Sequence, residues 1–293
     1  MNIKAYLVVL IDISWDDFNP LGISNMGNRI IVRKPPLQKC EKEVQLLLTF
    51  IKNTLKGKCV ITPFSGIYCR SAFHEEPFIS LWNQAVEQGG EIAIHTHEEI
   101  VEKGVIKDRI HYSNVIIQLL ERLKNAGIEP CGYRGGHATY FNFLTKFLEE
   151  LNLLIDLTSI PGFNKKSWSA VWSNTSLSAY YLCPFNHLVN CIHAQSNVLE
   201  IPLGFKGNKN DFRNYLWIEQ ADLNDLKSVW DSIVFRAERV GKPQIIYSLF
   251  HSHSMSKNKI VRRFSEFLEY ASNHGGKIVT SKEARKIFNI LNN

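Results

Sequence analysis

The chain alternates short apolar runs with segments in which apolar residues recur at helical spacing. Each apolar run is short enough for one strand, and glycine, proline or polar residues end the helical segments. The predicted strands cover residues 5–11, 59–64, 91–94, 244–250 and 276–280, and the predicted helices cover 41–55, 77–88, 110–126, 143–154, 222–240 and 259–273. Strands that alternate with helices are typical of β/α units, so the sequence predicts an α/β fold with parallel strands.

Three of the predicted strands end abruptly in acidic or imidazole side chains. These are Asp12 after the first run, His95 and His97 after the run 91–94, and His251 and His253 after the run 244–250. The carboxyl ends of parallel strands form the active-site face of such folds. A charged residue that merely ends a strand in water is the alternative for any one of them, but the recurrence favours a shared site.

The pair His95 and His97 is a candidate metal site, because neutral imidazole is the commonest metal ligand in proteins. We expect the backbone to turn just after Ile94, so that both rings reach one ion. For this segment alone, a solvated loop after a strand is the alternative.

A glycine-rich segment, 131–141, places Arg134 and His137 after another short strand. An arginine in that position can hold a carboxylate bidentately and keep it ionised. A turn with an exposed arginine is the alternative. The glycine pair lacks the spacing of a dinucleotide-binding or phosphate-binding motif.

Taken together, these segments resemble the polysaccharide deacetylase family, the NodB-homology carbohydrate esterases. The resemblance runs from Asp12 to roughly Ala284 and rests on ordered blocks at 11–12, 91–97, 132–136, 155–162, 199–203 and 250–255. It implies one catalytic domain over residues 1–293, folded as a distorted (β/α) barrel with about seven parallel strands. An irregular, aromatic-rich insertion at about 163–198 interrupts the pattern.

The first motif departs from the family pattern. Family members usually have two acids there, adjacent or one residue apart, whereas Ile13 and Ser14 follow Asp12 in this chain. The second acid must then come from Asp16 or Asp17, or the metal is held differently, or the site is degenerate.

The second motif also leaves an alternative. The usual spacing of its two ligands would pair His95 with Glu99, whereas a shorter spacing pairs His95 with His97. We favour His97 because imidazole is the better ligand for zinc-like ions, and Glu99 stays a candidate.

The resemblance implies a role for each candidate residue. A divalent ion, expected to be zinc, would be held by His95, His97 and an acid such as Asp16. Asp12, oriented by Arg134, would act as the base. One of His251 and His253 would protonate the leaving amine. Candidate substrate contacts are Tyr133, His137, Trp168 and Trp172, although aromatic side chains in an insertion also pack against one another.

The implied activity is metal-dependent removal of an acetyl group, most simply N-acetyl, from a sugar or polysaccharide precursor in surface glycan biosynthesis. The carbohydrate substrate would be an acetylated amino sugar, either free, nucleotide-linked or lipid-linked. One alternative is hydrolysis of another amide, such as a cyclic amide. The other is an inactive sugar-binding protein of the same fold, for which Ser14 is the main evidence.

Composition narrows the remaining classes. The net charge is +6, and the lysines are spread among acids rather than gathered in the stripe that nucleic acids require. No stretch approaches the roughly 20 apolar residues of a membrane span, and the start lacks the pattern of a secretory signal. We therefore expect a cytoplasmic protein. Six cysteines without CxxC spacing predict reduced, mostly buried thiols.

Overall fold

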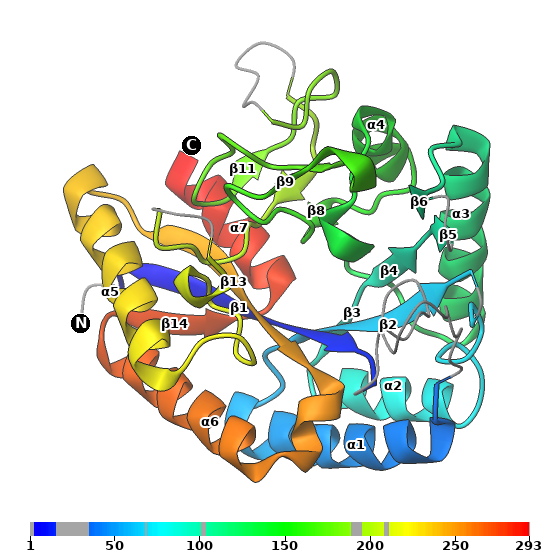
Figure 1. Ribbon diagram of the computed structural model, residues 1–293, viewed down its shortest axis with the longest axis horizontal. Coiled ribbons are helices and arrows are strands. Elements are labelled where there is room, and N and C mark those ends of the chain that lie inside the picture. Colours follow the sequence, from blue (N-terminus) through cyan, green and yellow to red (C-terminus); the bar gives the residue numbers. More distant parts are fainter. Residues whose placement is uncertain are drawn as a thin grey trace, which may run out of the picture.

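The computed structural model describes residues 3–15, 35–67, 69–100, 104–188, 195–207 and 211–292. Strands occupy its centre and helices lie outside them (Figure 1). The strands of the main sheet are β1 (Ala5–Ile13), β2 (Val60–Gly66), β3 (Glu91–Ile92), β4 (Ile94–His97), β7 (Tyr133–Gly135), β8 (Ile155–Asp156), β11 (Tyr180–Tyr181), β12 (Leu199–Glu200), β13 (Gln244–His251) and β14 (Gly276–Val279).

The sheet curls into a distorted barrel of parallel strands. Its order is β12-β8-β7-β4-β2-β1-β13, and every neighbouring pair in that series is parallel. The segment that follows β12 closes the circle through a parallel bridge between Leu203 and Tyr247. The predicted barrel of about seven parallel strands is therefore confirmed.

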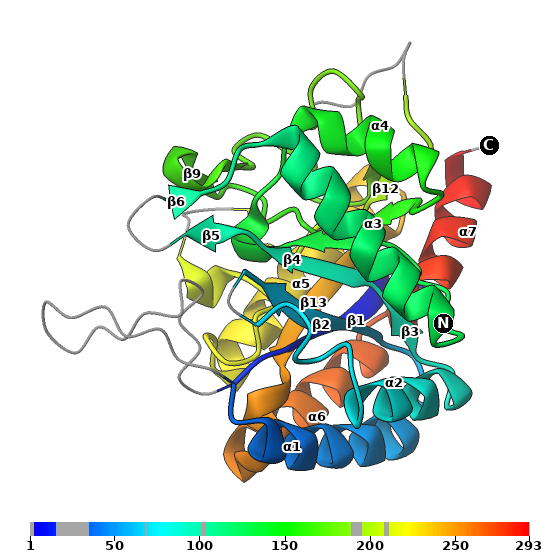
Figure 2. The same cartoon turned by 90° about the vertical axis from the view of Figure 1, so that its right-hand side faces the viewer.

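In the described part of the chain, seven α-helices surround the strands. They are α1 (Leu37–Phe50), α2 (Phe78–Glu87), α3 (Arg109–Asn125), α4 (Asn142–Glu150), α5 (Leu223–Val240), α6 (Asn258–Asn273) and α7 (Ser281–Asn292), and α1 continues into a π-helical turn, η1 (Ile51–Leu55). Figures 1 and 2 show α1, α2 and α6 on one side of the strands, with α3 and α4 on the opposite side. Because helices cover both sides, β1 and β13 are buried almost throughout.

Local sequence explains where several helices begin and end. The side chain of Asp222 accepts a hydrogen bond from the Asp225 backbone N–H at the start of α5. Gly241 then ends α5 in the left-handed conformation, with a φ of 70°. The prediction missed α7, whose first turn is fixed from a distance: buried Glu91 accepts hydrogen bonds from the N–H of Ser281 at 2.7 Å and of Lys282 at 3.2 Å.

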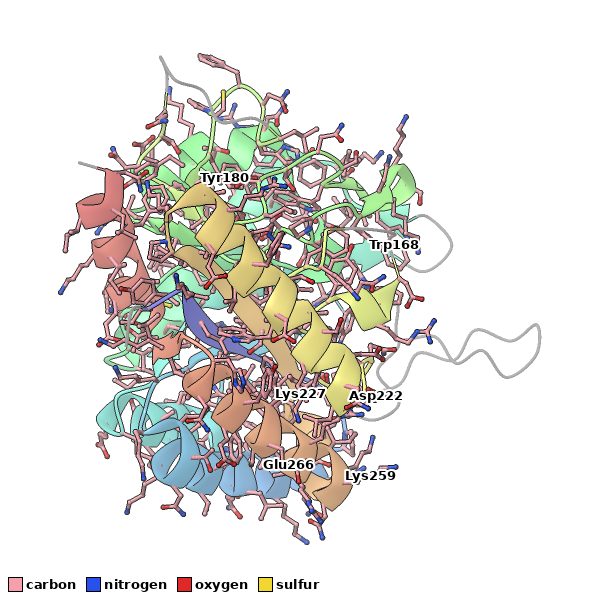
Figure 3. The ribbon with its side chains drawn as sticks, turned by 90° about the vertical axis from the view of Figure 1, so that its left-hand side faces the viewer. Trp168, Tyr180, Asp222, Lys227, Lys259 and Glu266 are labelled. Atoms are coloured by element: carbon pink, nitrogen blue, oxygen red, sulfur yellow. The ribbon has the colours of Figure 1, made fainter. Side chains whose placement is uncertain are left out.

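The aromatic-rich insertion contains only short elements in its described part. They are β9 (Asn164–Lys165), the 3₁₀ turn η3 (Lys166–Trp168), β10 (Ala170–Val171) and β11. Trp172 is fully buried, and its ring packs against His187. In Figure 3, Trp168 lies toward the same side of the molecule as Asp222 at the start of α5, whereas Tyr180 lies over the other end of that helix. Much of the insertion therefore packs on itself.

The thiol prediction is only partly right. Cys40, Cys59 and Cys131 are free and buried, and Cys69 is free and half-buried. Cys183, by contrast, is disulfide-bonded, so the expectation that its thiol is reduced is wrong. Cys191 lies outside the described residues. None of the helices that the structure describes is long and apolar enough to cross a bilayer.

Candidate active site

Strand register brings the polar strand ends together. Asp12 on β1 pairs with His251 on β13 and, on its other side, with Thr62 on β2. His95 on β4 pairs with Arg134 on β7. These ends surround a cavity of about 170 Å³ lined by Asp12, Ile13, Ser14, Phe64, His95, His97, Arg134, His137, Ala138, Ile160, Trp217, Leu249 and His251.

Asp12 and Arg134 form a buried ion pair beside this cavity. Arg134 Nε lies 2.8 Å from Asp12 Oδ1 and 3.0 Å from Oδ2. The Nη1 group points elsewhere, donating to Leu157 O at 2.6 Å and to Tyr247 Oη at 3.1 Å. Arg134 was expected to hold the carboxylate bidentately, but only its Nε contacts Asp12 in these interactions, while its Nη1 contacts the barrel wall.

The environment of Asp12 keeps its carboxylate ionised. Burial would raise the pKa of Asp12, but the charge of Arg134 and the hydrogen bond from Thr62 hold that pKa well below its usual range. Thr62 Oγ1 donates to Asp12 Oδ1 at 2.5 Å. Thr62 lies inside an apolar strand, and nothing in its sequence context marks it as a site residue.

His251 is held by an acid that sequence reasoning missed. Its backbone N–H donates to Glu219 Oε1 at 2.7 Å, and its Nδ1 lies 3.4 Å from Glu219 Oε2. Its Nε2 lies 3.9 Å from Asp12 Oδ2. Burial would lower the pKa of His251, but Glu219 and then Asp12 raise it above its ordinary value. An acid that ends the apolar run 215–218 repeats the strand-end pattern and could have identified Glu219.

The other candidate for protonating the leaving amine is His253, which lies in the short turn η5 (Ser252–Ser256) and is not among the residues that line the cavity. Its Nδ1 is 2.9 Å from Ser14 Oγ. Of the two histidines, only His251 thus faces both the cavity and Asp12.

His95 and His97 lie together because β4 continues through both. The expected turn after Ile94 is wrong: residues two apart on a strand face the same side, so no turn is needed. Their ring centroids are 4.6 Å apart. Burial lowers the pKa of His97 to about 3 and that of His95 well below its ordinary value, so both rings are neutral near pH 7.

The two rings suit a divalent ion in kind. His95 Nδ1 lies 3.4 Å from Thr62 O, while its buried Nε2 has no hydrogen-bond partner among the described residues. A backbone carbonyl on one ring nitrogen is a common support for a metal on the other.

The described residues provide fewer metal ligands than a catalytic zinc site usually has. A catalytic zinc site usually has about three protein ligands. Within the described ranges, no group of three His, Cys, Asp or Glu side chains is placed to hold an ion. Asp16 and Asp17 lie outside the described residues, as does the side chain of Glu99, whose backbone lies in β5 (Glu99–Ile100).

The glycine pair after Arg134 makes room for the histidines. A Cβ on Gly136 would lie 2.5 Å from atoms of the His97 ring, and one on Gly135 would lie 2.0 Å from Thr139 O. His137 follows in the left-handed region, with a φ of 53°. Its ring centroid is 5.1 Å from that of His97, so it extends the row of imidazoles along the cavity.

Of the predicted substrate contacts, only His137 lines the cavity. Tyr133 and Trp172 do not line it, contrary to the prediction, because both side chains are fully buried. Tyr133 Oη lies 2.8 Å from Thr96 Oγ1, and Trp172 Nε1 donates to Ala138 O at 2.7 Å. Trp168 is half-buried next to His137, with ring centroids 4.2 Å apart.

Comparison with solved structures supports this fold. A protein from Mycobacterium smegmatis assigned as a polysaccharide deacetylase matches with a TM-score of 0.64 and 14% identity, covering 99% of this chain and 92% of that one. The allantoinase Puue matches with a TM-score of 0.63 and 13% identity, covering 98% and 91%. A protein from Pseudomonas aeruginosa PAO1, also assigned as a polysaccharide deacetylase, gives 0.60, 13%, 97% and 90%.

No protein-family model matches the sequence, and no curated protein matches it either. The chain therefore has the fold of the polysaccharide deacetylases, and the resemblance inferred from the motifs is confirmed at that level.

Proposed function

We propose that the protein is a hydrolase of a carbon–nitrogen bond, and specifically a deacetylase that removes an N-acetyl group from a sugar or polysaccharide precursor. The observation that carries the proposal is the meeting of two polar pairs at one cavity, Asp12 with Arg134 and His251 with Glu219. One pair is suited to accept a proton and the other to donate one.

Asp12 serves as the base. Because its pKa lies well below its usual range, it is ionised at any working pH and can accept the proton of an attacking water. Arg134 fixes the carboxylate through Nε and is itself fixed by Leu157 O and Tyr247 Oη. Such a base is weak but well oriented, and orientation is a large part of the rate.

His251 serves as the acid. Glu219 favours its protonated form, and Nε2 lies on the side of Asp12, 3.9 Å from Oδ2. An acyl group bound in the cavity that both residues line would have the base on one side of its carbon and the leaving nitrogen near the imidazolium. Hydrolysis then gives acetate and a free amine, with the proton transferred from His251.

A divalent ion, expected to be zinc, forms part of the proposal, with His95 and His97 as the residues that would hold it. When bound there, it would polarise the acyl carbonyl and lower the pKa of a water. The neutral state of both rings and the free Nε2 of His95 support this assignment.

The substrate is proposed to be an acetylated amino sugar, free, nucleotide-linked or lipid-linked, in surface glycan biosynthesis. The similarity in fold to an allantoinase keeps hydrolysis of a cyclic amide as a second candidate. Ser14, which lines the cavity two residues after Asp12, is the observation behind an inactive, sugar-binding alternative.

Acetate release from N-acetylated amino sugars, measured on the purified protein with zinc added, tests the proposal. The wild type should release acetate, and Asp12→Asn and Glu219→Gln should each reduce kcat/KM. Asp211→Asn, which changes an exposed acid, is the matched control and should leave kcat/KM unchanged. Ring opening of a cyclic amide, without acetate release from any acetylated amino sugar, would favour the second candidate. Binding of the sugar without any hydrolysis would favour the inactive protein.

A further inference from the structure

Two carboxyl groups lie side by side in the barrel wall next to Arg134. Asp156 on β8 and Glu200 on β12 are paired residues of adjacent parallel strands. Both are fully buried, at 0% exposure. Neither lines the cavity, and neither takes part in the proton transfers described above. A buried pair of acids is costly, so the arrangement requires an explanation.

A count of hydrogen bonds shows what the pair lacks. Asp156 Oδ1 accepts from Thr158 Oγ1 at 2.6 Å, and Glu200 Oε1 accepts from the Ser159 N–H at 3.0 Å. The other two oxygens, Asp156 Oδ2 and Glu200 Oε2, are buried and have no donor among the described residues. Two ionised carboxylates cannot satisfy each other, whereas one proton between them would satisfy both oxygens.

We infer that Asp156 and Glu200 share a single proton between Oδ2 and Oε2, and that the resulting pair holds the strand segment that positions Arg134. The pair would then carry one negative charge rather than two. Its role is structural support of the proposed base, and in that part the inference rests on the proposed function. The shared proton itself does not depend on that function.

Electrostatics agrees with the hydrogen-bond count. Burial raises the pKa of both Asp156 and Glu200. A hydrogen bond between the two groups raises the pKa of Glu200 further and lowers that of Asp156, which places the proton on Glu200. Arg134 lowers both pKa values, which favours keeping one of the two groups ionised.

The first link to Arg134 runs through residues 157 and 158. Thr158 Oγ1, which donates to Asp156, also accepts from the Gly135 N–H at 2.8 Å. Leu157 O, the carbonyl between those two side chains, accepts from Arg134 Nη1 at 2.6 Å. Asp156 therefore fixes both the backbone after Arg134 and one acceptor of its guanidinium.

The second link runs through residue 159. Glu200 holds the Ser159 N–H, and Ser159 O lies 3.3 Å from Tyr247 Oη. Tyr247 Oη is in turn the other acceptor of Arg134 Nη1. The two carboxyl groups thus reach both of the fixed partners of Arg134 outside Asp12.

Among the residues that the structure describes, few other groups can titrate beside the pair. Those that face it are the guanidinium of Arg134 and the phenols of Tyr133, Tyr140, Tyr180 and Tyr247. Burial raises the pKa of Tyr140, Tyr180 and Tyr247 above its ordinary value, so these three phenols stay neutral in mildly alkaline solution. In that range the carboxyl pair is the unit expected to lose a proton.

The sign of the effect on stability follows from linkage. Glu200 has a raised pKa in the folded protein. At pH values above the ordinary pKa of a glutamic acid, the folded protein therefore binds a proton that the unfolded chain has lost. The stabilisation is complete below the pKa of the unfolded group. It is lost as the pH rises through the folded pKa, because the second carboxylate must then be buried as a charge.

Glu200→Gln tests the shared proton. The glutamine N–H can donate permanently to Asp156 Oδ2, while its carbonyl can still accept from Ser159 N–H. The matched control is Glu91→Gln, which changes another buried glutamate that instead accepts hydrogen bonds from Ser281. Thermal unfolding of the full chain is measured from about pH 5 to about pH 10 for all three proteins.

The expected result is a wild-type Tm that falls as the pH rises through the upper part of this range. Glu200→Gln should flatten that fall, and Glu91→Gln should keep it whatever its absolute Tm. Infrared spectroscopy gives an independent readout: the carbonyl band of a protonated carboxylic acid should be present near neutral pH in the wild type and in Glu91→Gln. It should be absent in Glu200→Gln. Parallel stability curves for wild type and Glu200→Gln, or no such band in the wild type, would overturn the shared proton.

Catalytic assays test the positioning role separately. Glu200→Ala should lower kcat/KM for an acetylated amino sugar roughly 10- to 100-fold, since small displacements of a positioned group are costly. Glu200→Gln should restore most of that loss. Equal activities in Glu200→Ala and wild type would overturn the positioning role. No hydrolysis by the wild type would overturn the proposed function instead, while the infrared and stability data would still decide the shared proton.

Discussion

Asp12 and His251 are paired residues at the carboxyl ends of adjacent strands, and Asp12 Oδ2 lies 3.9 Å from His251 Nε2. Each is tied to a partner of opposite charge on its other side, Arg134 for Asp12 and Glu219 for His251. The two side chains therefore face one cavity in opposite protonation states, and this difference sets the expected pH dependence of activity.

Arg134→Lys should reduce activity strongly. Lysine keeps the positive charge but cannot contact Asp12, Leu157 O and Tyr247 Oη at the same time. We expect kcat/KM for acetate release to fall roughly 10- to 100-fold. Arg262→Lys, at an exposed ion pair with Glu266, is the control and should behave as wild type. Full activity in Arg134→Lys would show that the arginine does not position the base.

The pH dependence of kcat/KM should be set by His251 on the alkaline side. The acid must be protonated, and its pKa is raised, so activity should persist through neutrality and fall as the pH rises through that pKa. Asp12 must be ionised, and its pKa is well below its usual range, so Asp12 should not limit activity down to about pH 4. If kcat/KM already decreased as the pH was raised from about 5 to about 6, the role of His251 would be contradicted.

Glu219→Gln should shift that alkaline limit. Removing the carboxylate removes the main influence that raises the pKa of His251, while burial continues to lower it. The alkaline limb of the pH–rate profile should therefore move to lower pH, in addition to any loss of maximal rate. An unchanged limb would show that His251 is not the titrating acid.

Gly136→Ala should disturb His97. The added Cβ would lie 2.5 Å from three atoms of the His97 ring, which packing cannot accommodate without movement. We expect a stability loss of about 1–3 kcal/mol, measured by denaturant unfolding, together with reduced activity. Gly127→Ala is the control: it strains a residue with a φ of 77° but meets no atom within 4 Å. It should lower stability and leave activity intact.

His95→Ala and His97→Ala should each lower bound zinc. Both rings are buried and neutral, and each removal would take away one of about three protein ligands. Zinc content after dialysis, measured by atomic spectroscopy, gives the readout without any assay of activity. His274→Ala, at an exposed ring, should match wild type. Equal zinc in all four proteins would refute the metal assignment.

The sequence predicted the parallel α/β fold and the strand ends that surround its cavity because both follow from short-range patterns, whereas the barrel was implied by the family resemblance. An apolar run that stops at a polar residue marks a strand and its end, and parallel strands place all such ends on one face. That argument reached Asp12, His95, His97 and His251, which the structure brings to one cavity.

The supporting residues were harder to predict, since they depend on register between strands that are distant in the chain. Thr62 and Tyr247 lie inside apolar runs. The pairing of β1 with β2 places Thr62 beside Asp12, whereas Tyr247 on β13 contacts Arg134 on β7, a strand that is not its neighbour in the sheet. Trp172 shows the opposite difficulty: an aromatic residue in an insertion suggested ligand contact, but its indole fills the core.

The pairing of β1 with β13 also has a consequence for how the chain folds. Residues 14–243 separate β1 from β13 along the chain, yet the two strands pair along the whole stretch from Ala5 with Gln244 to Asp12 with His251. Contacts between residues this far apart in the chain make folding slow, because the entropy of closing a very long loop is lost before the contacts can stabilise the structure. During synthesis, the pairing of β1 with β13 must therefore wait until β13 and all the residues between the two strands have emerged. The candidate base and acid meet only in that late step, so a partly folded chain would lack their pairing altogether.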